Sequence, residues 1–508
     1  MFASSHSFGF FDYFRVPYRL TSARPGSAFG RLWLAGDQGG PSLVWPVVDP
    51  VRGPAVREAL PGRYAMERFP VFGHVTGDRV ARRFLAGWGE GGWRKAELVT
   101  GAGGREVAAV WRDGAGNVFL PFDPAEVMHQ YWSEGYKGIG QPALRRALRP
   151  ALVRGYYGIR PLLPRAAQIA ARRMFARFQQ RPEFPAWPVE TALHDFYDWL
   201  FRLVADFAGR PVPWLAPWPA GYSWAIVLTH DVETAGGCRD IELLRAPERA
   251  AGRPSGWNFV PLRYTVENDL LDRLRAEGCE IGVHGLRHDG RDLGSLRQLR
   301  KRLPAMRAYA QRWKATGFRA PATQRNWSWM PMLGFEHDMS YHDTAPYEPT
   351  PGGTCSYLPF FNGTMVELPI TQPQDHTLFT ILGHSDAQVW LTKATEIRKR
   401  GGMMLVLTHP DYAGDPRVAG GYRQLLDSAA GDTEAWWATP AQVSAWWRRR
   451  AQSGVALSRG GWRVSGPAAA EGRLLFAEPF AEPGVPAASA AGNTNTGGRG
   501  QHARPARR

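Results

Sequence analysis

Two histidines four residues apart offer the clearest chemistry in the chain. His284 and His288 lie in the segment Gly282–Asp289, which begins at the end of a short apolar run. One helical turn brings side chains with this spacing about 5–6 Å apart between Cβ atoms, close enough to bind one metal ion. Surface histidines with this spacing also arise by chance. The pair therefore predicts a metal site only if other ligand-type residues converge on it.

Such residues follow two further apolar runs. Asp231 and Glu233 come after Trp224–Thr229, and His409 comes after Met403–Thr408. A buried carboxylate is costly unless it binds a cation or works as an acid or base. Because side chains at i and i+2 share a face of a strand, both carboxylates are expected to face one site. Each residue alone is readily explained as a satisfied core residue, but together they favour shared chemistry.

The elements that must hold these residues alternate between strands and helices from about residue 216. The expected strands are Trp224–Thr229, Trp257–Val260, Glu280–Val283, Met365–Ile370 and Met403–Thr408. The expected helices are Val266–Glu277, Asp292–Lys314 with an interruption at Pro304, Asp386–Lys399 and Pro440–Ala451. This alternation predicts a mainly parallel sheet or an α/β barrel. In both, reactive residues gather at the carboxyl ends of the strands, where Asp231, His284 and His409 fall.

Four short motifs occur in a fixed order along this part of the chain. They are Thr229-His230-Asp231-Val232-Glu233, the pair His284 and His288, Arg319-Ala320-Pro321, and Leu407-Thr408-His409. In this order and rough spacing, the segment from about 222 to 448 resembles the NodB homology domain of polysaccharide deacetylases, carbohydrate esterase family 4. The resemblance implies an α/β fold, an irregular (β/α) barrel, and a metal-dependent hydrolase.

The chain departs from the family pattern at three positions. Val232 stands where the family has a metal-binding Asp, Gly285 where it has Ser or Thr, and Ala322 where it has Tyr. The second carboxylate comes one residue later, at Glu233. The resemblance therefore assigns Asp231 as the base and Glu233 as a metal ligand, and leaves open whether Asp231 itself binds the metal.

The resemblance also implies a mechanism with one divalent ion, expected to be zinc, with cobalt and nickel as alternatives. The predicted ligands are Glu233, His284 and His288. The ion would lower the pKa of a bound water toward about 7. Asp231, oriented by Arg319, would take the water's proton as it attacks an acetyl carbonyl. The ion and a backbone N–H would stabilise the oxyanion, and His409 would protonate the departing amine, or the alcohol of an ester.

Three further residues are candidates for binding the substrate. The family's fourth motif, an Asp and a Trp that line the acetyl pocket, has only Asp343 and Trp327 as candidates here. Asp375 lies in a loop just after the expected strand Met365–Ile370. It is expected either to bind sugar hydroxyls or to cap the following helix.

The 508 residues divide into four expected parts. Residues 1–215 form an N-terminal α+β region of unknown function, with short strands followed by basic helices. Residues 216–451 form the deacetylase-like domain, residues 452–483 a small β appendage, and residues 484–508 a disordered basic tail. The segment Gly101–Gly104 is expected to be a hairpin turn, because no helix follows it as a phosphate-binding loop requires.

The net charge of +16 is concentrated in one basic stretch. Residues 142–181 carry many arginines at roughly helical spacing with apolar residues, so they are expected to form basic helices. These helices would either contact an anionic membrane surface or present a solvated face. No DNA-reading motif accompanies them, so a nucleic-acid partner is not expected. Without a recognisable signal peptide or an apolar run long enough to span a bilayer, the expected location is the cytoplasm, with membrane association as an option.

The sequence thus predicts a metal-dependent hydrolase that removes acetyl groups from an N-acetylated sugar or a glycan precursor. Two alternatives stay open. One is hydrolysis of a non-sugar C–N amide bond on the same metal site. The other is a non-catalytic glycan-binding barrel, which the missing Asp at Val232 would suit.

Overall fold

The computed structural model describes residues 9–20, 29–34, 40–49, 53–88, 92–139, 170, 172–174 and 184–479. The predicted basic stretch 142–181, apart from residue 170 and residues 172–174, lies outside the described residues. The predicted tail 484–508 also lies outside them.

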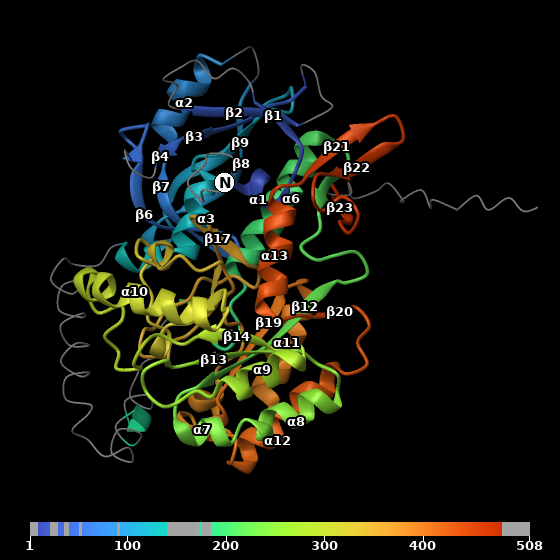
Figure 1. The fold of residues 1–508 in the computed structure, drawn as a ribbon. Helices are drawn as coiled ribbons and strands as arrows, with labels where there is room; N and C mark the ends of the chain where they lie inside the picture. The colour runs from blue at the N-terminus through green and yellow to red at the C-terminus, as the bar shows by residue number, and fades with distance from the viewer. Residues whose placement is uncertain are drawn as a thin grey trace, which may run out of the picture.

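An eight-stranded sheet makes up most of the N-terminal region (Figure 1). Its strand order is β1-β2-β3-β10-β9-β8-β6-β7. The strands are β1 (Tyr18–Leu20), β2 (Phe29–Leu34), β3 (Leu43–Pro46), β6 (Leu60–Met66), β7 (Phe69–Val75), β8 (Arg94–Thr100), β9 (Glu106–Arg112) and β10 (Val118–Phe119). Alternate residues of β2 are buried, which is the pattern of a strand with one face on a core. The predicted turn is confirmed, because Gly101–Gly104 joins the antiparallel strands β8 and β9.

Helices cover this sheet and link it to the rest of the chain. They are α1 (Gly9–Phe14), α2 (Asp78–Ala86), α3 (Pro124–Trp132) and α6 (Ala192–Ala208). Between β3 and β6 in the sequence, β4 (Val48–Asp49) and β5 (Gly53–Pro54) pair with each other as a small two-stranded ribbon. The described part of the N-terminal region thus contains both strands and helices.

The second sheet carries the predicted strand ends. Its order is β17-β18-β16-β15-β14-β13-β12-β19, and β20 also pairs with β12. The strands are β12 (Trp224–Val232), β13 (Ser255–Phe259), β14 (Glu280–Val283), β15 (Gly317–Phe318), β16 (His337–Asp338), β17 (Phe360–Asn362), β18 (Met365–Glu367), β19 (Met403–Thr408) and β20 (Ala435–Trp437). All pairs are parallel except β17 with β18. Every residue of β12 is buried, as expected for a central strand with covered faces.

The two ends of this sheet approach each other without a continuous strand pair. The backbone N–H groups of Thr371 and Gln372, just beyond β18, donate to the carbonyl of Leu405 on β19 at 3.2 and 3.1 Å. The described residues therefore form a curled α/β sheet. A closed or irregular (β/α) barrel stays a prediction.

Helices pack outside the second sheet. They are α7 (Ala235–Arg239), α8 (Glu242–Ala250), α9 (Asn268–Ala276), α10 (Leu296–Arg312), α11 (Gln388–Lys399), α12 (Pro416–Ala429) and α13 (Pro440–Ala451). The interruption expected at Pro304 is wrong, because α10 runs through it. Pro304 lies on the exposed side of α10, where the backbone hydrogen bond that proline cannot donate is less costly to lose.

The two sheets share one hydrophobic core across the boundary expected near residue 215. Val71 of β7 and Leu200 of α6 belong to the same cluster of buried side chains as Val227 of β12 and Leu405 of β19. In Figure 1 the N-terminal sheet lies above the second sheet, with α13 close to both. The N-terminal region is thus packed directly on the domain that carries the predicted site.

The C-terminal part returns to the joint between the two regions. Strands β21 (Gly454–Ser458) and β22 (Gly461–Ser465) form a hairpin. Strand β23 (Leu474–Ala477) pairs with β11 (Val212–Leu215), which lies in the segment that links the regions. The described residues of this part thus form three short strands, in the segment where a small β appendage was expected.

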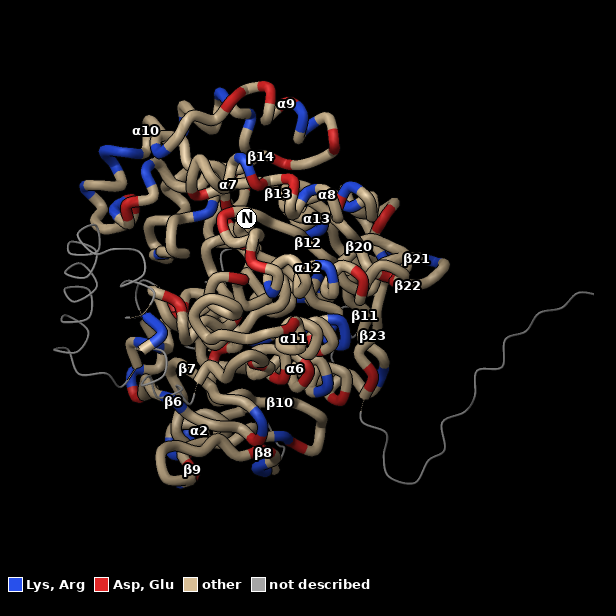
Figure 2. The backbone as a smooth tube through the Cα atoms, turned by 90° about the horizontal axis from the view of Figure 1, so that it is seen from below, with Lys and Arg blue, Asp and Glu red and all other residues tan. Residues whose placement is uncertain are grey.

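Charged residues are mixed over the described backbone, with a run of Lys and Arg along α10 (Figure 2). Among the described residues, no helix combines the length and the apolar character that a membrane crossing requires.

Candidate functional site

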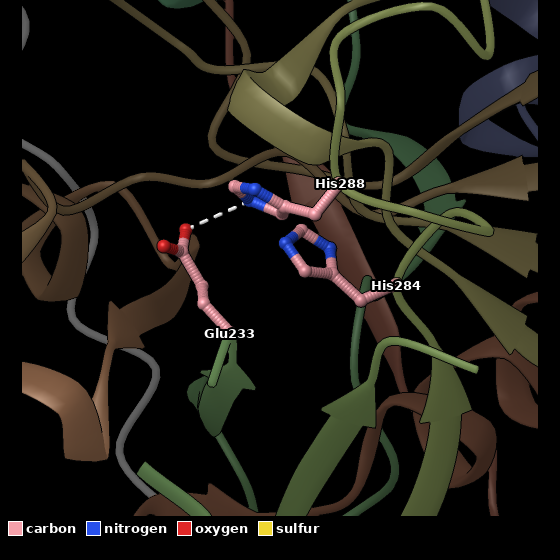
Figure 3. Close-up of side chains that lie close together, drawn as sticks. All are labelled: Glu233, His284 and His288. Carbon is pink, nitrogen blue, oxygen red and sulfur yellow. Dashed lines mark ion pairs between the residues drawn. The ribbon is translucent and has the colours of Figure 1, made fainter. Parts of the chain in front are cut away.

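Three predicted ligands meet at the carboxyl ends of β12 and β14 (Figure 3). One ligand atom from each of Glu233, His284 and His288 lies within 4.8 Å of the others. The Oε1 atom of Glu233 is 2.9 Å from Nε2 of His288. The side chains of His284 and His288 are 2% and 5% exposed, so water solvates these rings very little.

The donor atoms of this cluster fit a divalent cation. Among the described residues, the buried Nε2 atom of His284 makes no hydrogen bond, whereas Nε2 of His288 pairs with Glu233. A buried polar atom without a partner costs about 1–3 kcal/mol. Two imidazole nitrogens and a carboxylate are a common ligand set for zinc, with a further position left for water. These residues are therefore suited to hold one ion.

The surroundings of His284 and Glu233 shift their pKa values toward the protonation states in which these side chains bind a metal ion. Burial lowers the pKa of His284 to about 4, so its ring is neutral at pH 7. Burial would raise the pKa of Glu233, but the neighbouring His288 and His409 hold it well below its ordinary value. A neutral imidazole and an ionised carboxylate are the states that bind metals.

An irregular loop joins the two histidines. The helical turn that their four-residue spacing suggested is not formed there, so that prediction is wrong. Gly285 and His288 have φ angles of 62° and 53°, in the left-handed region. These turns bring the ring centroids of the histidines to 5.0 Å. Asp292 stabilises the loop by accepting a hydrogen bond from the N–H of Leu286, and Arg302 in turn holds Asp292.

Glycine at position 285 is required by close packing as well as by its φ angle. A Cβ at Gly285 would lie 2.5 Å from the ring of Pro321 and 2.4 Å from Oδ2 of Asp292. A side chain at position 285 would therefore clash with both residues.

We expect Gly285→Ala to destabilise the metal-free protein well beyond the 1–2 kcal/mol or so of a left-handed backbone. The matched control is Gly278→Ala, where φ is 80° and nothing lies within 4 Å of the added Cβ. Urea unfolding of both variants measures the difference. Equal losses of stability would show that Pro321 and Asp292 do not restrict position 285.

Asp231 and Arg319 form a buried ion pair beside the cluster. Nη1 of Arg319 donates to Oδ1 of Asp231 at 3.0 Å, and Nη2 donates to Thr229 at 2.8 Å. Burial would raise the pKa of Asp231, but Arg319 and His284 hold it below its ordinary value. Oδ2 of Asp231 lies 3.6 Å from Nε2 of His284. As the two-residue spacing predicts, Asp231 and Glu233 both face the histidines.

His409 also lies near Glu233 and is bound by Asp375. Its Nδ1 is 2.6 Å from Oδ1 of Asp375, and its backbone N–H donates to Oδ2 at 2.8 Å. Its Nε2 is 3.8 Å from Oε1 of Glu233. Burial alone would lower the pKa of His409, but Asp375 and Glu233 raise it to about 10. His409 is therefore a buried cation with one nitrogen directed toward the cluster.

Of the three predicted substrate-binding residues, Asp375 lies nearest to the cluster, and its carboxylate is directed to His409. It also accepts a hydrogen bond from the N–H of His376, the first residue of the short helix His376–Ile381, which corresponds to the capping alternative. Asp343 is paired instead with Lys393, Nζ to Oδ2 at 2.6 Å, and both are buried. Trp327 packs edge-on against His129, with ring centroids 5.3 Å apart, and stacks on Phe360. The structure thus brings neither Asp343 nor Trp327 to the cluster by any contact it describes.

Two further residues position the site, and the sequence analysis missed both. Nδ2 of Asn258 donates to Asp231 at 2.9 Å, and Asp411 accepts a hydrogen bond from the N–H of Glu233. Asn258 lies near the carboxyl end of β13. Because reactive residues are expected at such strand ends, the reasoning that selected Asp231 could also have selected Asn258. Asp411 follows His409 by two residues. Its contact with Glu233 joins residues 178 positions apart, so no local sequence pattern indicates that contact.

Comparisons with known proteins give similarity in structure only. No protein-family model and no curated protein sequence matches the chain. A Mycobacterium smegmatis protein assigned as a polysaccharide deacetylase is 19% identical, covers 48% of this chain and 96% of its own, and has a TM-score of 0.38. The allantoinase Puue is 16% identical, with 46% and 93% coverage and a TM-score of 0.38. The peptidoglycan deacetylase PdaC from Bacillus subtilis is 13% identical, with 45% and 93% coverage and a TM-score of 0.31. Over somewhat less than half of its length, the chain is similar to solved structures of polysaccharide deacetylases and of an allantoinase.

Proposed function

We propose that this protein is a metal-dependent hydrolase that removes acetyl groups from an N-acetylated sugar or a glycan precursor. The observation that carries the proposal is that two buried pairs of charged side chains lie next to the cluster of Glu233, His284 and His288. The Asp231–Arg319 pair lies within reach of His284, and the His409–Asp375 pair lies within reach of Glu233. These are the groups that hydrolysis of an amide by an activated water requires.

The ligands are proposed to be Glu233, His284 and His288, and the ion is proposed to be zinc, with cobalt or nickel as alternatives. When bound, such an ion supplies an activated water and polarises the acetyl carbonyl. Arg319 keeps Asp231 ionised and fixes its orientation, so that Asp231 can accept the proton of the attacking water. Asn258 holds the same carboxylate oxygen as Arg319, which leaves the second oxygen of Asp231 facing the histidines.

His409 is proposed to act as the acid. Asp375 binds Nδ1 of the imidazolium, so the proton available for transfer is the one on Nε2. Transfer of that proton to the departing nitrogen releases the amine, or the alcohol in the case of an ester. The proton taken up by Asp231 is then released to solvent, and His409 takes up one proton at Nε2, so that the carboxylate and the imidazolium are both restored.

This assignment predicts a pH effect for Asp375→Asn. Loss of the carboxylate removes the main source of charge that raises the pKa of His409 to about 10. The pKa of His409 should therefore fall, and the alkaline limb of the kcat/KM profile should move to lower pH. Measured rates between pH 6 and about 10 test this. An unchanged alkaline limb in a folded variant would contradict the role of His409 as the acid.

Acetate release tests the proposed function. The chelated protein, with and without added zinc, is incubated with oligomers of N-acetylated amino sugars, with an O-acetylated glycan and with a cyclic amide. Zinc-dependent release of acetate from the amino-sugar oligomers supports the proposal. Hydrolysis of the cyclic amide alone, seen as ring opening without acetate, would favour a hydrolase of non-sugar amides. Binding of glycan without any turnover would favour a non-catalytic barrel.

A further inference from the structure

The segment from Arg319 to Arg325 contacts the loop that carries both histidine ligands. The carbonyl of Arg319 lies 3.1 Å from Nδ1 of His284. The ring of Pro321 fills the space above Gly285, where no Cβ fits. Farther along, Nε2 of Gln324 donates to the carbonyl of Gly290 at 3.0 Å. This segment therefore contacts His284 directly and packs against the loop to His288 at Gly285 and just beyond it, at Gly290.

The backbone of the same segment is in a conformation that it would not adopt by itself. Ala322 and Thr323 are consecutive non-glycine residues with φ angles of 53° and 48°. Such left-handed residues are unfavourable and persist only where surrounding contacts fix them. Nη1 of Arg325 donates to the carbonyl of Thr323 at 3.1 Å, so Arg325 supplies one of these contacts.

Arg325 is in turn held by a carboxylate of the N-terminal region. Its Nε donates to Oε2 of Glu134 at 3.1 Å, and a second nitrogen binds the other carboxylate oxygen. The two side chains are 1% and 8% exposed, so the ion pair is buried at the junction of the two regions. Lys137 also binds Glu134, at 2.6 Å, and Arg325 lies over the ring of Tyr341.

Glu134 itself occupies an unfavourable backbone position. It follows α3 with a φ angle of 56°, where Gly or Asn would fit with less strain. The neighbouring loop is shaped around it, since a Cβ at Gly352 would lie 1.9 Å from Lys137 and 2.8 Å from Oε1 of Glu134. The described contacts thus link the N-terminal region to the histidine loop through Glu134, Arg325 and the segment that begins at Arg319.

We propose that Glu134 and Arg325 are positioning residues of the metal centre, and that this gives the N-terminal region its role in the site. Neither side chain touches the cluster. They fix the segment that supports His284 and the loop to His288, so that the ligands are preorganised before an ion binds. The inference rests on the proposed metal site and goes beyond it, because it places a determinant of metal affinity outside the deacetylase-like domain.

Zinc affinity of the full chain tests the inference. Glu134→Gln and Arg325→Gln are compared with Asp195→Asn, which breaks another ion pair between the two regions. In that pair, Nη2 of Arg400 is 2.6 Å from Oδ1 of Asp195 on α6, and it has no described contact with the Arg319–Arg325 segment. We expect the dissociation constant for zinc to rise about 10–100-fold in the first two variants, as for other residues that orient metal ligands. It should stay at the wild-type value in Asp195→Asn, and Arg325→Lys should recover part of the loss.

A second measurement uses the wild-type protein and does not depend on how the variants fold. Because coupling between two sites is reciprocal, zinc should slow amide hydrogen exchange at residues 133–139 of the N-terminal region as well as at 319–326. Exchange at 192–200 of α6 should not change. Equal zinc affinities of Glu134→Gln and Asp195→Asn, or unchanged exchange at 133–139, would overturn the inference while leaving the proposed function intact. A wild-type chain that binds no zinc would instead overturn the proposed metal site, and this inference with it.

Discussion

Replacing His288 with alanine is expected to reduce hydrolysis by about 10³-fold or more, because one of three metal ligands is lost. Nε2 of His288 lies 2.9 Å from Glu233, so the substitution also removes the closest partner of that carboxylate. The pKa of Glu233 should then rise toward its ordinary value or above it, since burial is no longer offset by His288. Both changes weaken binding of a cation. Acetate release at saturating zinc measures the effect.

The control for this prediction is His384→Ala, which removes a histidine outside the cluster. The ring of His384 lies near Trp187, with centroids 6.5 Å apart. Its loss should leave the rate within about twofold of wild type, as is usual for substitutions away from a site. Near-normal turnover by His288→Ala with zinc present would show that His288 is not a ligand.

Replacing Asp231 with asparagine is expected to lower kcat by about 10²–10⁴-fold, the usual contribution of a general base. Asparagine has nearly the same shape, but it cannot accept a proton from water at neutral pH. It also removes the negative charge that Arg319 and His284 face. Metal binding should survive, because Glu233, His284 and His288 are unchanged. The measurement is kcat together with metal content.

Asp240→Asn is the matched control, since Asp240 is an exposed carboxylate shortly after the same strand. It should leave both kcat and metal content unchanged. If Asp231→Asn lost its metal as well as its activity, Asp231 would be a ligand, and the assignment of Glu233 as the only carboxylate ligand would be wrong. Full activity in Asp231→Asn would contradict any role for Asp231 as the base.

The strand ends were predictable from the sequence because they depend on local patterns. Apolar runs that stop at an ionisable residue located β12, β14 and β19 to within a few residues, and the rule for parallel sheets then grouped Asp231, His284 and His409. The loop between His284 and His288 was not predictable. Its left-handed residues, Gly285 and His288, lie in a loop that packs on Pro321 at Gly285 and is held by the hydrogen bond from Leu286 to Asp292.

Contacts between distant segments were also beyond the sequence. Asp375 was expected to bind sugar or cap a helix, and its bond to His409 joins positions 34 apart in two separate segments, after β18 and after β19. The Glu134–Arg325 pair joins positions 191 apart, so no local spacing indicates it. The roles of Asp343 and Trp327 as substrate-binding residues stay predictions, and their observed partners are Lys393 for the first and His129 for the second.

Metal content of the purified chain tests the central claim most directly. Elemental analysis of the wild type and of the His284→Ala/His288→Ala double variant should find about one divalent ion per wild-type chain and none in the variant. That result would establish the cluster of Glu233, His284 and His288 as a metal centre. A folded wild type that binds no ion, even after zinc, cobalt or nickel is supplied, would contradict metal-dependent hydrolysis and favour a barrel that only binds glycans.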